Sequence, residues 1–120
     1  MFKVNFYFDL NNKSEVYDLL EDLKKKKSKD ARINRNKILA YIRLLERHGV
    51  LIGEPICKHL EGEIYELRPL DNRILFFYHE DDQYILLTHF EKKTNKTPKR
   101  EIERAKSKMD EYISRKINNN

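Results

Sequence analysis

The chain has 120 residues with 25 Lys and Arg against 20 Asp and Glu, a net charge of +5, and 38% of its residues are charged while 39% are apolar. Seven tyrosines and six phenylalanines favour a packed core over disorder, and no apolar run approaches the roughly 20 residues that span a membrane. One cysteine, Cys57, excludes an internal disulfide framework, and the N-terminal residues do not resemble a signal peptide. We therefore expect one small domain over residues 1–120, located in the cytoplasm without a membrane segment.

The first half of the chain predicts a strand and two helices. An apolar, aromatic run over residues 2–10 is typical of a strand. Residues 13–27 predict a helix with apolar residues at helical spacing, capped by Asn12 with a glutamate three positions on. Asp30 is expected to cap a second helix, which Gly49 ends. Two helices joined by a short turn form a helical hairpin, whose apolar faces need a sheet to cover.

The second half predicts four strands and a last helix. The runs that are typical of strands are residues 56–60, 63–68, 73–79 and 83–90. Their short connections make these strands antiparallel. Thr97 and Pro98 predict the N-cap and first residue of the last helix, and residues 118–120 are expected to fray. The expected fold class is therefore α+β, with a mostly antiparallel sheet and the element order βααββββα.

Positive charge is concentrated in two segments. Residues 24–47 carry ten Lys and Arg against two acids, a net charge of +8, and residues 91–108 carry eight against three, a net charge of +5. Such basic blocks suit a phosphate-bearing partner or an acidic protein partner. For the lysine run within residues 24–29 alone, a solvated turn is the simpler interpretation.

Two arginines are predicted to face each other across a loop at residues 69–72. Arg68 ends one expected strand and Arg73 begins the next, and like charges directly opposite each other destabilise a sheet. An anion bound between them would explain the pair, since the guanidinium fork matches phosphate oxygens. The alternative is that both arginines pair with nearby acids, Glu66 or Asp71.

A basic loop follows the last expected strand. Lys92, Lys93 and Lys96 lie in this loop, and loops at strand ends often carry binding residues. Together with the two arginines, Lys92 and Lys93 would form a positive pocket of the size of a phosphate group, with Lys96 nearby. The alternative is a basic loop that is simply solvated.

Two histidines, His59 and His89, lie near the ends of expected strands. A pair of histidines suits acid–base cleavage of RNA, in which one group removes the 2′-OH proton and another protonates the 5′-oxygen. The alternative for each is a place facing the core or a helix. Cys57 and His59 have no second pair at zinc-ligand spacing, so we expect no metal site and no cofactor.

Several motifs in the second half of the chain resemble a known family. They are Ile64-Tyr65-Glu66-Leu67-Arg68, Arg73-Ile74-Leu75-Phe76-Phe77, Phe90-Glu91-Lys92-Lys93-Thr94-Asn95-Lys96-Thr97-Pro98 and Glu101-Ile102-Glu103-Arg104-Ala105. In this order they resemble the RelE/ParE toxin superfamily, and within it the HigB-type, phage-derived RelE-like toxins of type II toxin–antitoxin systems. The resemblance covers residues 56–110, while the first 50 residues agree only in their strand–helix–helix layout. It implies a RelE-like fold.

The resemblance also implies an activity and partners. It implies a metal-independent endoribonuclease that cleaves mRNA on the ribosome and so inhibits translation, by attack of the 2′-OH on the adjacent phosphate. It further implies a cognate antitoxin, HigA-like with a helix-turn-helix, through which the toxin–antitoxin complex binds operator DNA. The alternative is a ParE-like toxin, which inhibits DNA gyrase without catalysis. Cations gathered on the concave face of the sheet would favour the endoribonuclease.

Carried over by position, the resemblance assigns roles to individual residues. Arg73 resembles the family's phosphate-stabilising arginine, and Arg68 matches the arginine that closes the preceding motif. The expected catalytic residues are Arg68, Arg73, Lys93 and His89, and the expected RNA-binding residues are Lys92, Lys96, Lys58 and His59. Glu66 stands where RelE-type enzymes carry a lysine, and no tyrosine lies near Lys99. The general base is therefore left open among His89, His59 and a lysine with a depressed pKa.

The antitoxin is expected to contact the outward rows of the helical hairpin, because the core needs its apolar faces. These rows belong to the basic segment of residues 24–47, so an acidic antitoxin segment would match their charge. The residues expected to make this contact are Arg32, Arg35 and Arg43.

Overall fold

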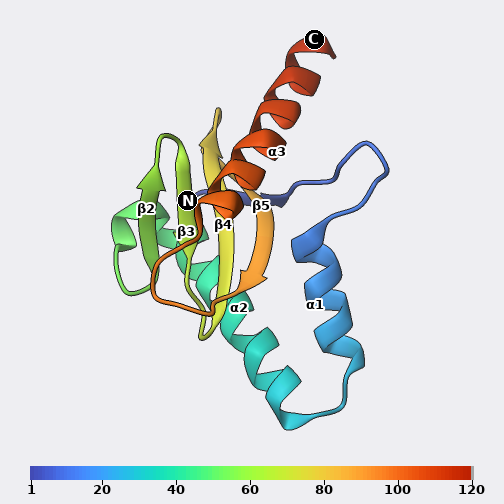
Figure 1. Cartoon of the computed structure of the whole chain (residues 1–120), viewed down its shortest axis with the longest axis vertical. Helices are drawn as coiled ribbons and strands as arrows, with labels where there is room; N and C mark the ends of the chain where they lie inside the picture. Colours follow the sequence, from blue (N-terminus) through green and yellow to red (C-terminus); the bar gives the residue numbers. More distant parts are fainter. Residues whose placement is uncertain (120) are drawn as a thin grey trace.

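A five-stranded sheet with helices on both faces organises the chain in the computed structural model, which describes residues 1–119 (Figure 1). In chain order the elements are β1 (Lys3–Phe6), α1 (Glu15–Lys25), α2 (Lys29–His48), the 3₁₀ helix η1 (Gly49–Ile52), β2 (Cys57–Glu61), β3 (Ile64–Leu67), β4 (Asn72–His79), β5 (Gln83–Glu91) and α3 (Lys99–Asn118). This order matches the predicted one except for η1, which the sequence patterns do not predict.

The strands lie in the order β1-β5-β4-β3-β2. β1 runs parallel to β5, whereas the other three pairings are antiparallel, so the prediction of an α+β fold with a mostly antiparallel sheet is confirmed. β2 to β5 follow one another across the sheet because short turns join them. The two helices between β1 and β2 carry the chain from one edge of the sheet to the other.

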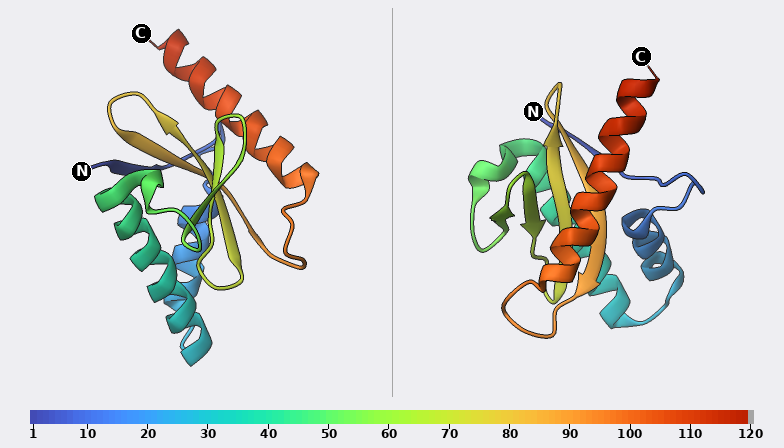
Figure 2. Two further views of the ribbon diagram at one scale, coloured as in Figure 1. Left: turned by 90° about the vertical axis from the view of Figure 1, so that its left-hand side faces the viewer. Right: turned by 45° about the horizontal axis from the view of Figure 1, so that its top comes forward.

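Helices cover both faces of the sheet (Figure 2). The side chains that α1 and α2 bury against one face are Val16, Leu20, Ile38 and Leu45. Those that α3 buries against the other face are Ile102 and Ala105. Because successive residues of a strand point to opposite faces, Phe76 of β4 lies under α1 and α2, while Leu75 and Phe77 lie under α3.

A β-bulge in β5 interrupts this alternation. Phe76 pairs with Leu86, but the preceding residue of β4, Leu75, pairs with Thr88. Leu87 is therefore the extra residue on β5. Residues of β5 beyond the bulge point to the face opposite the one that strict alternation predicts.

Serines begin both helices of the hairpin. The hydroxyl oxygens of Ser14 and Ser28 each accept a hydrogen bond from the third backbone N–H of the helix that follows. The predicted caps Asn12 and Asp30 are therefore wrong, because each lies two residues from the serine whose hydroxyl is in reach of the free N–H groups. The predicted end of α2 at Gly49 is confirmed, and this glycine has a φ of +66°.

The two ends of the chain differ from the prediction in detail. β1 covers Lys3–Phe6 rather than residues 2–10, because the Asp9 carboxylate accepts hydrogen bonds from two backbone N–H groups of a turn that follows. In the segment predicted to fray, α3 extends through Asn118 and is capped at Asn119, while Asn120 lies outside the described residues. Within residues 1–119, no helix combines the length and apolar character needed to cross a membrane.

Candidate functional site

A buried carboxylate lies between the two arginines that the sequence places at the β3–β4 turn. Glu66 of β3 is 1% exposed, on the face covered by α3. Its Oε1 lies 3.6 Å from Arg68 Nε and 4.0 Å from Arg73 Nε. Its Oε2 accepts a hydrogen bond of 2.5 Å from the Thr97 hydroxyl. Two cations and a hydroxyl therefore offset the cost of burying this charge.

The side chain of Arg73 is buried in the protein interior. Its Nη1 donates hydrogen bonds to the carbonyls of Leu70 at 2.9 Å and Asn72 at 2.8 Å, which ties it to the β3–β4 turn. Burial, followed by the charge of Arg68, lowers the pKa of Arg73. Both arginines therefore pair with a nearby acid, Glu66, as in the second of the two interpretations of the sequence.

Arg68 is the more accessible arginine of the pair. Its side chain is 20% exposed, against 6% for Arg73. Its Nη1 lies 3.4 Å from the exposed carboxylate of Glu54, whereas its buried Nε–H has no hydrogen-bond partner in the described part of the chain. A solvent-borne anion can therefore reach Arg68 more readily than Arg73.

A pocket beside this cluster gathers three of the predicted RNA-binding residues. Lys58 and His59 of β2 and Lys96 of the β5–α3 loop line a pocket of about 420 Å³. Thr97 lines the same pocket and donates its hydroxyl hydrogen to Glu66. The inner wall of the pocket is thus one hydrogen bond from the carboxylate that the arginines share. Since its hydroxyl is used there, Thr97 does not cap α3, which corrects the prediction.

Two lysines of α3 that contact the pocket residue Glu61 were not predicted from the sequence as part of the site. Lys99 and Lys106 both contact the carboxylate of Glu61, which lines the pocket. Hydrogen bonds from Lys106 and Lys99 lower the pKa of Glu61 to about 2. Their spacing could have indicated this, because residues seven positions apart lie on the same face of a helix.

The remaining loop lysines lie apart from that pocket. Lys93 lines a separate pocket of about 370 Å³ together with Arg100. Lys92 is half-buried, and its backbone N–H donates to the carbonyl of Asp71 at 2.8 Å, which joins the loop to the β3–β4 turn. The structure therefore divides the predicted basic loop between two pockets.

His89 lies away from the arginines. The bulge in β5 pairs it with Ile74, on the face toward α1 and α2. Its Nε2 is 2.9 Å from Asn72 Oδ1, and its backbone N–H donates to Glu15 Oε1 at 3.1 Å. Burial lowers the pKa of its imidazole. The bulge therefore places His89 on the face opposite Arg73, which agrees with the alternative of a place facing a helix, and its catalytic role stays a prediction.

The three arginines expected to contact an antitoxin do not form one row. Arg32 and Arg43 are exposed on α2. Arg35 turns toward α1 instead, where it is half-buried and its Nε donates to the carbonyl of Leu20 at 3.3 Å. The expectation that all three face outward is corrected for Arg35. Among residues 1–119 no group of three or more His, Cys, Asp or Glu is placed to hold a metal ion.

The fold has a counterpart among solved structures, and the sequence matches a known family. The structure is similar to a chain in the crystal structure of the archaeal RelE–RelB complex from Pyrococcus horikoshii OT3, with a TM-score of 0.52 and 18% sequence identity over 75% of this chain and 93% of that one. The predicted RelE-like fold is thereby confirmed. The profile of the family described as phage derived protein Gp49-like (DUF891) matches residues 18–110, so the chain belongs to that family. No curated protein matches the sequence.

Proposed function

We propose that this protein is the toxin of a type II toxin–antitoxin pair and cleaves mRNA on the ribosome without a metal cofactor. Its Gp49-like family and RelE-like fold support this assignment. The observation that carries it is the pocket formed by Lys58, His59 and Lys96, whose wall is one hydrogen bond from the carboxylate between the two arginines.

The pocket suits a backbone phosphate of RNA. Lys58 and Lys96 attract the phosphate, and Arg68 is the arginine exposed enough to donate hydrogen bonds to its oxygens as negative charge builds in the transition state. Arg73 acts through its neighbours, because it is buried and holds the turn beside Arg68. Lys93 and Lys92 follow on the loop and would contact the flanking nucleotides.

The proposed reaction needs two proton transfers. A base removes the 2′-OH proton, the 2′-oxygen attacks the adjacent phosphorus, and the bond to the 5′-oxygen breaks as an acid protonates it, giving a cyclic phosphate and a free 5′-OH. His59 is nearer to the pocket than His89 because the residue lines it, but its ring packs against Tyr65 on the face toward α1 and α2, with 4.9 Å between the ring centroids, so the base and the acid stay unassigned. The Nε2 of His59 lies 2.8 Å from the carbonyl of Gly62, which orients the ring.

Substitution of Arg68, which lies beside the pocket and shares Glu66 with it, tests this proposal. Arg68→Ala is expected to reduce ribosome-dependent cleavage about 100-fold or more, since losing one transition-state donor has effects of that order. Arg47→Ala, at an exposed position of α2, is the matched control and is expected to cleave like the unaltered chain. Cleavage is measured by primer extension in a translating extract, with folding checked by circular dichroism. A folded Arg68→Ala chain that cleaves at the full rate would refute the proposed site.

The alternative activity has its own readout. A ParE-like toxin would leave mRNA intact and would inhibit DNA supercoiling by gyrase. If the unaltered chain inhibits gyrase but cuts no mRNA on ribosomes, the protein is a gyrase-binding toxin and the proposed nuclease activity is refuted.

The proposed reaction needs no metal ion. Cleavage is therefore expected to continue after EDTA treatment, in an assay where the ribosomes stay competent.

The proposed partner is a cognate HigA-like antitoxin with a helix-turn-helix, through which the complex would bind operator DNA. Arg32 and Arg43 form the exposed part of the expected contact. Charge reversal at Arg43 is expected to weaken antitoxin binding and its salt dependence, while cleavage by the free toxin stays unchanged. Calorimetry at two salt concentrations and primer extension measure the two effects. Lost cleavage with unaltered antitoxin affinity would make this surface a substrate or ribosome contact instead.

A further inference from the structure

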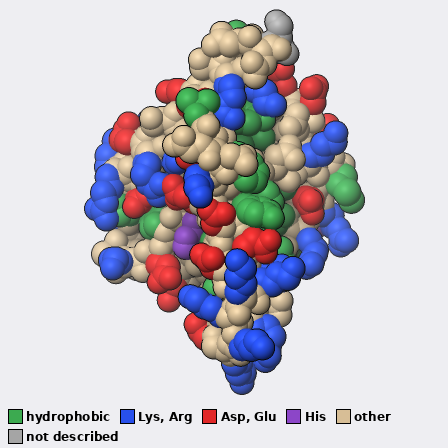
Figure 3. Space-filling model, turned by 90° about the vertical axis from the view of Figure 1, so that its right-hand side faces the viewer, with side chains coloured by type: hydrophobic (Ala, Val, Ile, Leu, Met, Phe, Trp, Pro, Cys, Tyr) green, Lys and Arg blue, Asp and Glu red, His purple; other side chains and the backbone are tan. Residues whose placement is uncertain are grey.

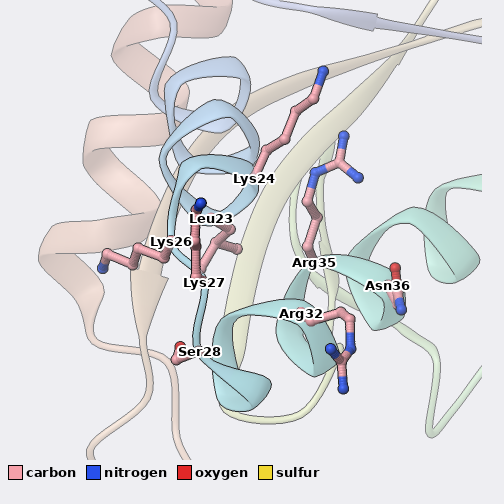
Figure 4. A pocket seen from close by; sticks show the side chains of 8 residues that line it. All are labelled: Leu23, Lys24, Lys26, Lys27, Ser28, Arg32, Arg35 and Asn36. Atoms are coloured by element: carbon pink, nitrogen blue, oxygen red, sulfur yellow. The ribbon is translucent and has the colours of Figure 1, made fainter.

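A hollow at the turn between α1 and α2 is lined by cationic side chains (Figure 4). Its volume is about 210 Å³, and the cations that line it are Lys24, Lys26, Lys27, Arg32 and Arg35. No acidic side chain lines it. Within residues 1–119, none of the five forms an ion pair. Figure 3 shows Lys and Arg side chains gathered at the same end of the molecule.

Helix-end electrostatics explain only part of this cluster. Lys24 lies in the last turn of α1, where a cation stabilises the negative end of the helix dipole. Arg32 lies close to the start of α2, where the dipole disfavours a cation. The acids nearby, Asp30, Asp71 and Glu91, line an adjacent pocket, which Lys26 shares with them. The other four cations, Lys24, Lys27, Arg32 and Arg35, therefore have no acidic side chain in their pocket among the described residues.

One arginine of the hollow is held in place. The Nε of Arg35 donates to the carbonyl of Leu20, so its two terminal nitrogens remain available as donors. In Figure 4 the side chains of Arg35 and Lys24 extend to the same side of the hollow. Ser28, the N-cap of the 20-residue helix α2, also lines the hollow and brings the positive end of that helix to the site. An anion would therefore meet one guanidinium that is held in position before it binds.

We propose that this hollow binds phosphate groups, and that in the functioning protein these belong to an RNA backbone. Phosphate oxygens match the donors of Arg35, and consecutive phosphates supply several negative charges within a short length of chain. A docking protein segment would need apolar area at the centre of its contact. The hollow offers little of it, because Leu23 is the one apolar side chain of its lining. This site is separate from the pocket of Lys58, His59 and Lys96 and does not depend on the proposed cleavage.

Binding of a single-stranded 2′-O-methyl oligoribonucleotide tests the inference, because this probe has no 2′-OH and cannot be cut. Fluorescence anisotropy gives its affinity at several salt concentrations. Lys24→Gln with Lys27→Gln is expected to weaken binding about tenfold and to reduce the salt slope by about 1.4, as for two lost phosphate contacts to a single strand. Lys37→Gln with Arg47→Gln is the matched control, since it removes two charges from exposed positions of α2 outside the hollow.

Each outcome decides the proposal. The proposal is supported if the Lys24/Lys27 pair and Arg35→Gln both weaken binding of the oligonucleotide while the control pair does not. Equal losses in both double variants would overturn it, since general positive charge would then suffice. A loss confined to Arg35→Gln would also overturn it, because Arg35 would then act through the fold. Inorganic pyrophosphate that displaces the probe at low micromolar concentration would point to a free phosphate ligand, and tighter binding of a polyglutamate peptide would overturn the inference in favour of an acidic protein.

Discussion

The hydroxyl of Thr97 donates a hydrogen bond of 2.5 Å to Oε2 of Glu66, which lies 31 residues earlier in the chain. This contact joins the end of the β5–α3 loop to β3. Through the other oxygen of Glu66 it also reaches Arg68 and Arg73. One buried carboxylate therefore positions both the arginine pair and the basic loop that follows β5.

Substitution of Thr97 tests this link. Thr97→Val keeps the shape of the side chain but leaves one oxygen of buried Glu66 without its donor, so we expect a loss of about 1–3 kcal/mol in the free energy of unfolding. Thr94→Val is the control, because Thr94 is exposed and its hydroxyl bonds only to the carbonyl of Lys96. Urea unfolding measures both. If both substitutions lower the free energy of unfolding equally, the hydrogen bond from Thr97 to Glu66 stabilises the fold no more than the exposed one made by Thr94.

Arg73 is expected to be essential for folding as well as for any activity. Arg73→Met removes one partner of a buried charge and two hydrogen bonds to backbone carbonyls, and we expect a loss of about 3–5 kcal/mol in unfolding free energy. Adding Glu66→Gln, which removes the stranded negative charge, is expected to restore part of this loss. Two losses that simply add in a double-mutant cycle would show that the two side chains do not interact. Loss of cleavage after Arg73 substitution therefore needs a folding control.

Gly49 is expected to tolerate no side chain. It has a φ of +66°, and a Cβ there would lie 2.8 Å from the Phe2 ring and 2.9 Å from the Tyr84 hydroxyl. Gly49→Ala is expected to lower the unfolding free energy by about 1–3 kcal/mol through overpacking, in addition to the backbone strain. Gly62→Ala carries only the strain, because its φ is +54° and no atom lies within 4 Å of a Cβ there. Thermal unfolding compares them, and a less stable Gly62→Ala would contradict the packing argument.

His89 is expected to make the protein less stable in mild acid. Burial lowers its pKa below the ordinary value of 6.5, so the unfolded chain binds the proton more readily than the folded one. Its contribution to stability is therefore complete above about pH 6.5 and is lost as the pH falls toward the folded pKa. Unfolding free energies of the unaltered chain and of His89→Gln, measured by urea unfolding from pH 7.5 to pH 5, are expected to converge in acid. An unchanged pH dependence in His89→Gln, with His48→Gln as control, would contradict this.

Local patterns in the sequence were sufficient to predict most of the fold. Apolar residues at helical spacing placed the three helices, and alternating or β-branched runs placed the five strands, because these periods follow from backbone geometry alone. The RelE-like fold could be expected from the motifs of the second half, and it is confirmed. The helix caps were less predictable, because Ser14 and Asn12 both have capping side chains and only the backbone path selects between them.

The candidate site depended on contacts that no local pattern specifies. The four-residue loop predicted that Arg68 and Arg73 would be neighbours, and the alternation of β3 placed Glu66 on the same face as Arg68. Sequence alone left both Glu66 and Asp71 as candidates for the counter-charge. The tertiary fold decided for Glu66, because packing of the β5–α3 loop buries it and brings Thr97 to its second oxygen.

The side of the sheet on which His89 lies was decided by one extra residue in β5. Strict alternation from Ile85 would put His89 on the α3 face, with Arg73, but the bulge at Leu87 moves it to the face of α1 and α2. The sequence by itself therefore determined the elements, the basic segments and the arginine pair, which depend on near neighbours in the chain. The tertiary structure alone decided which charges share a pocket, since strand register and loop packing join residues that lie far apart in sequence.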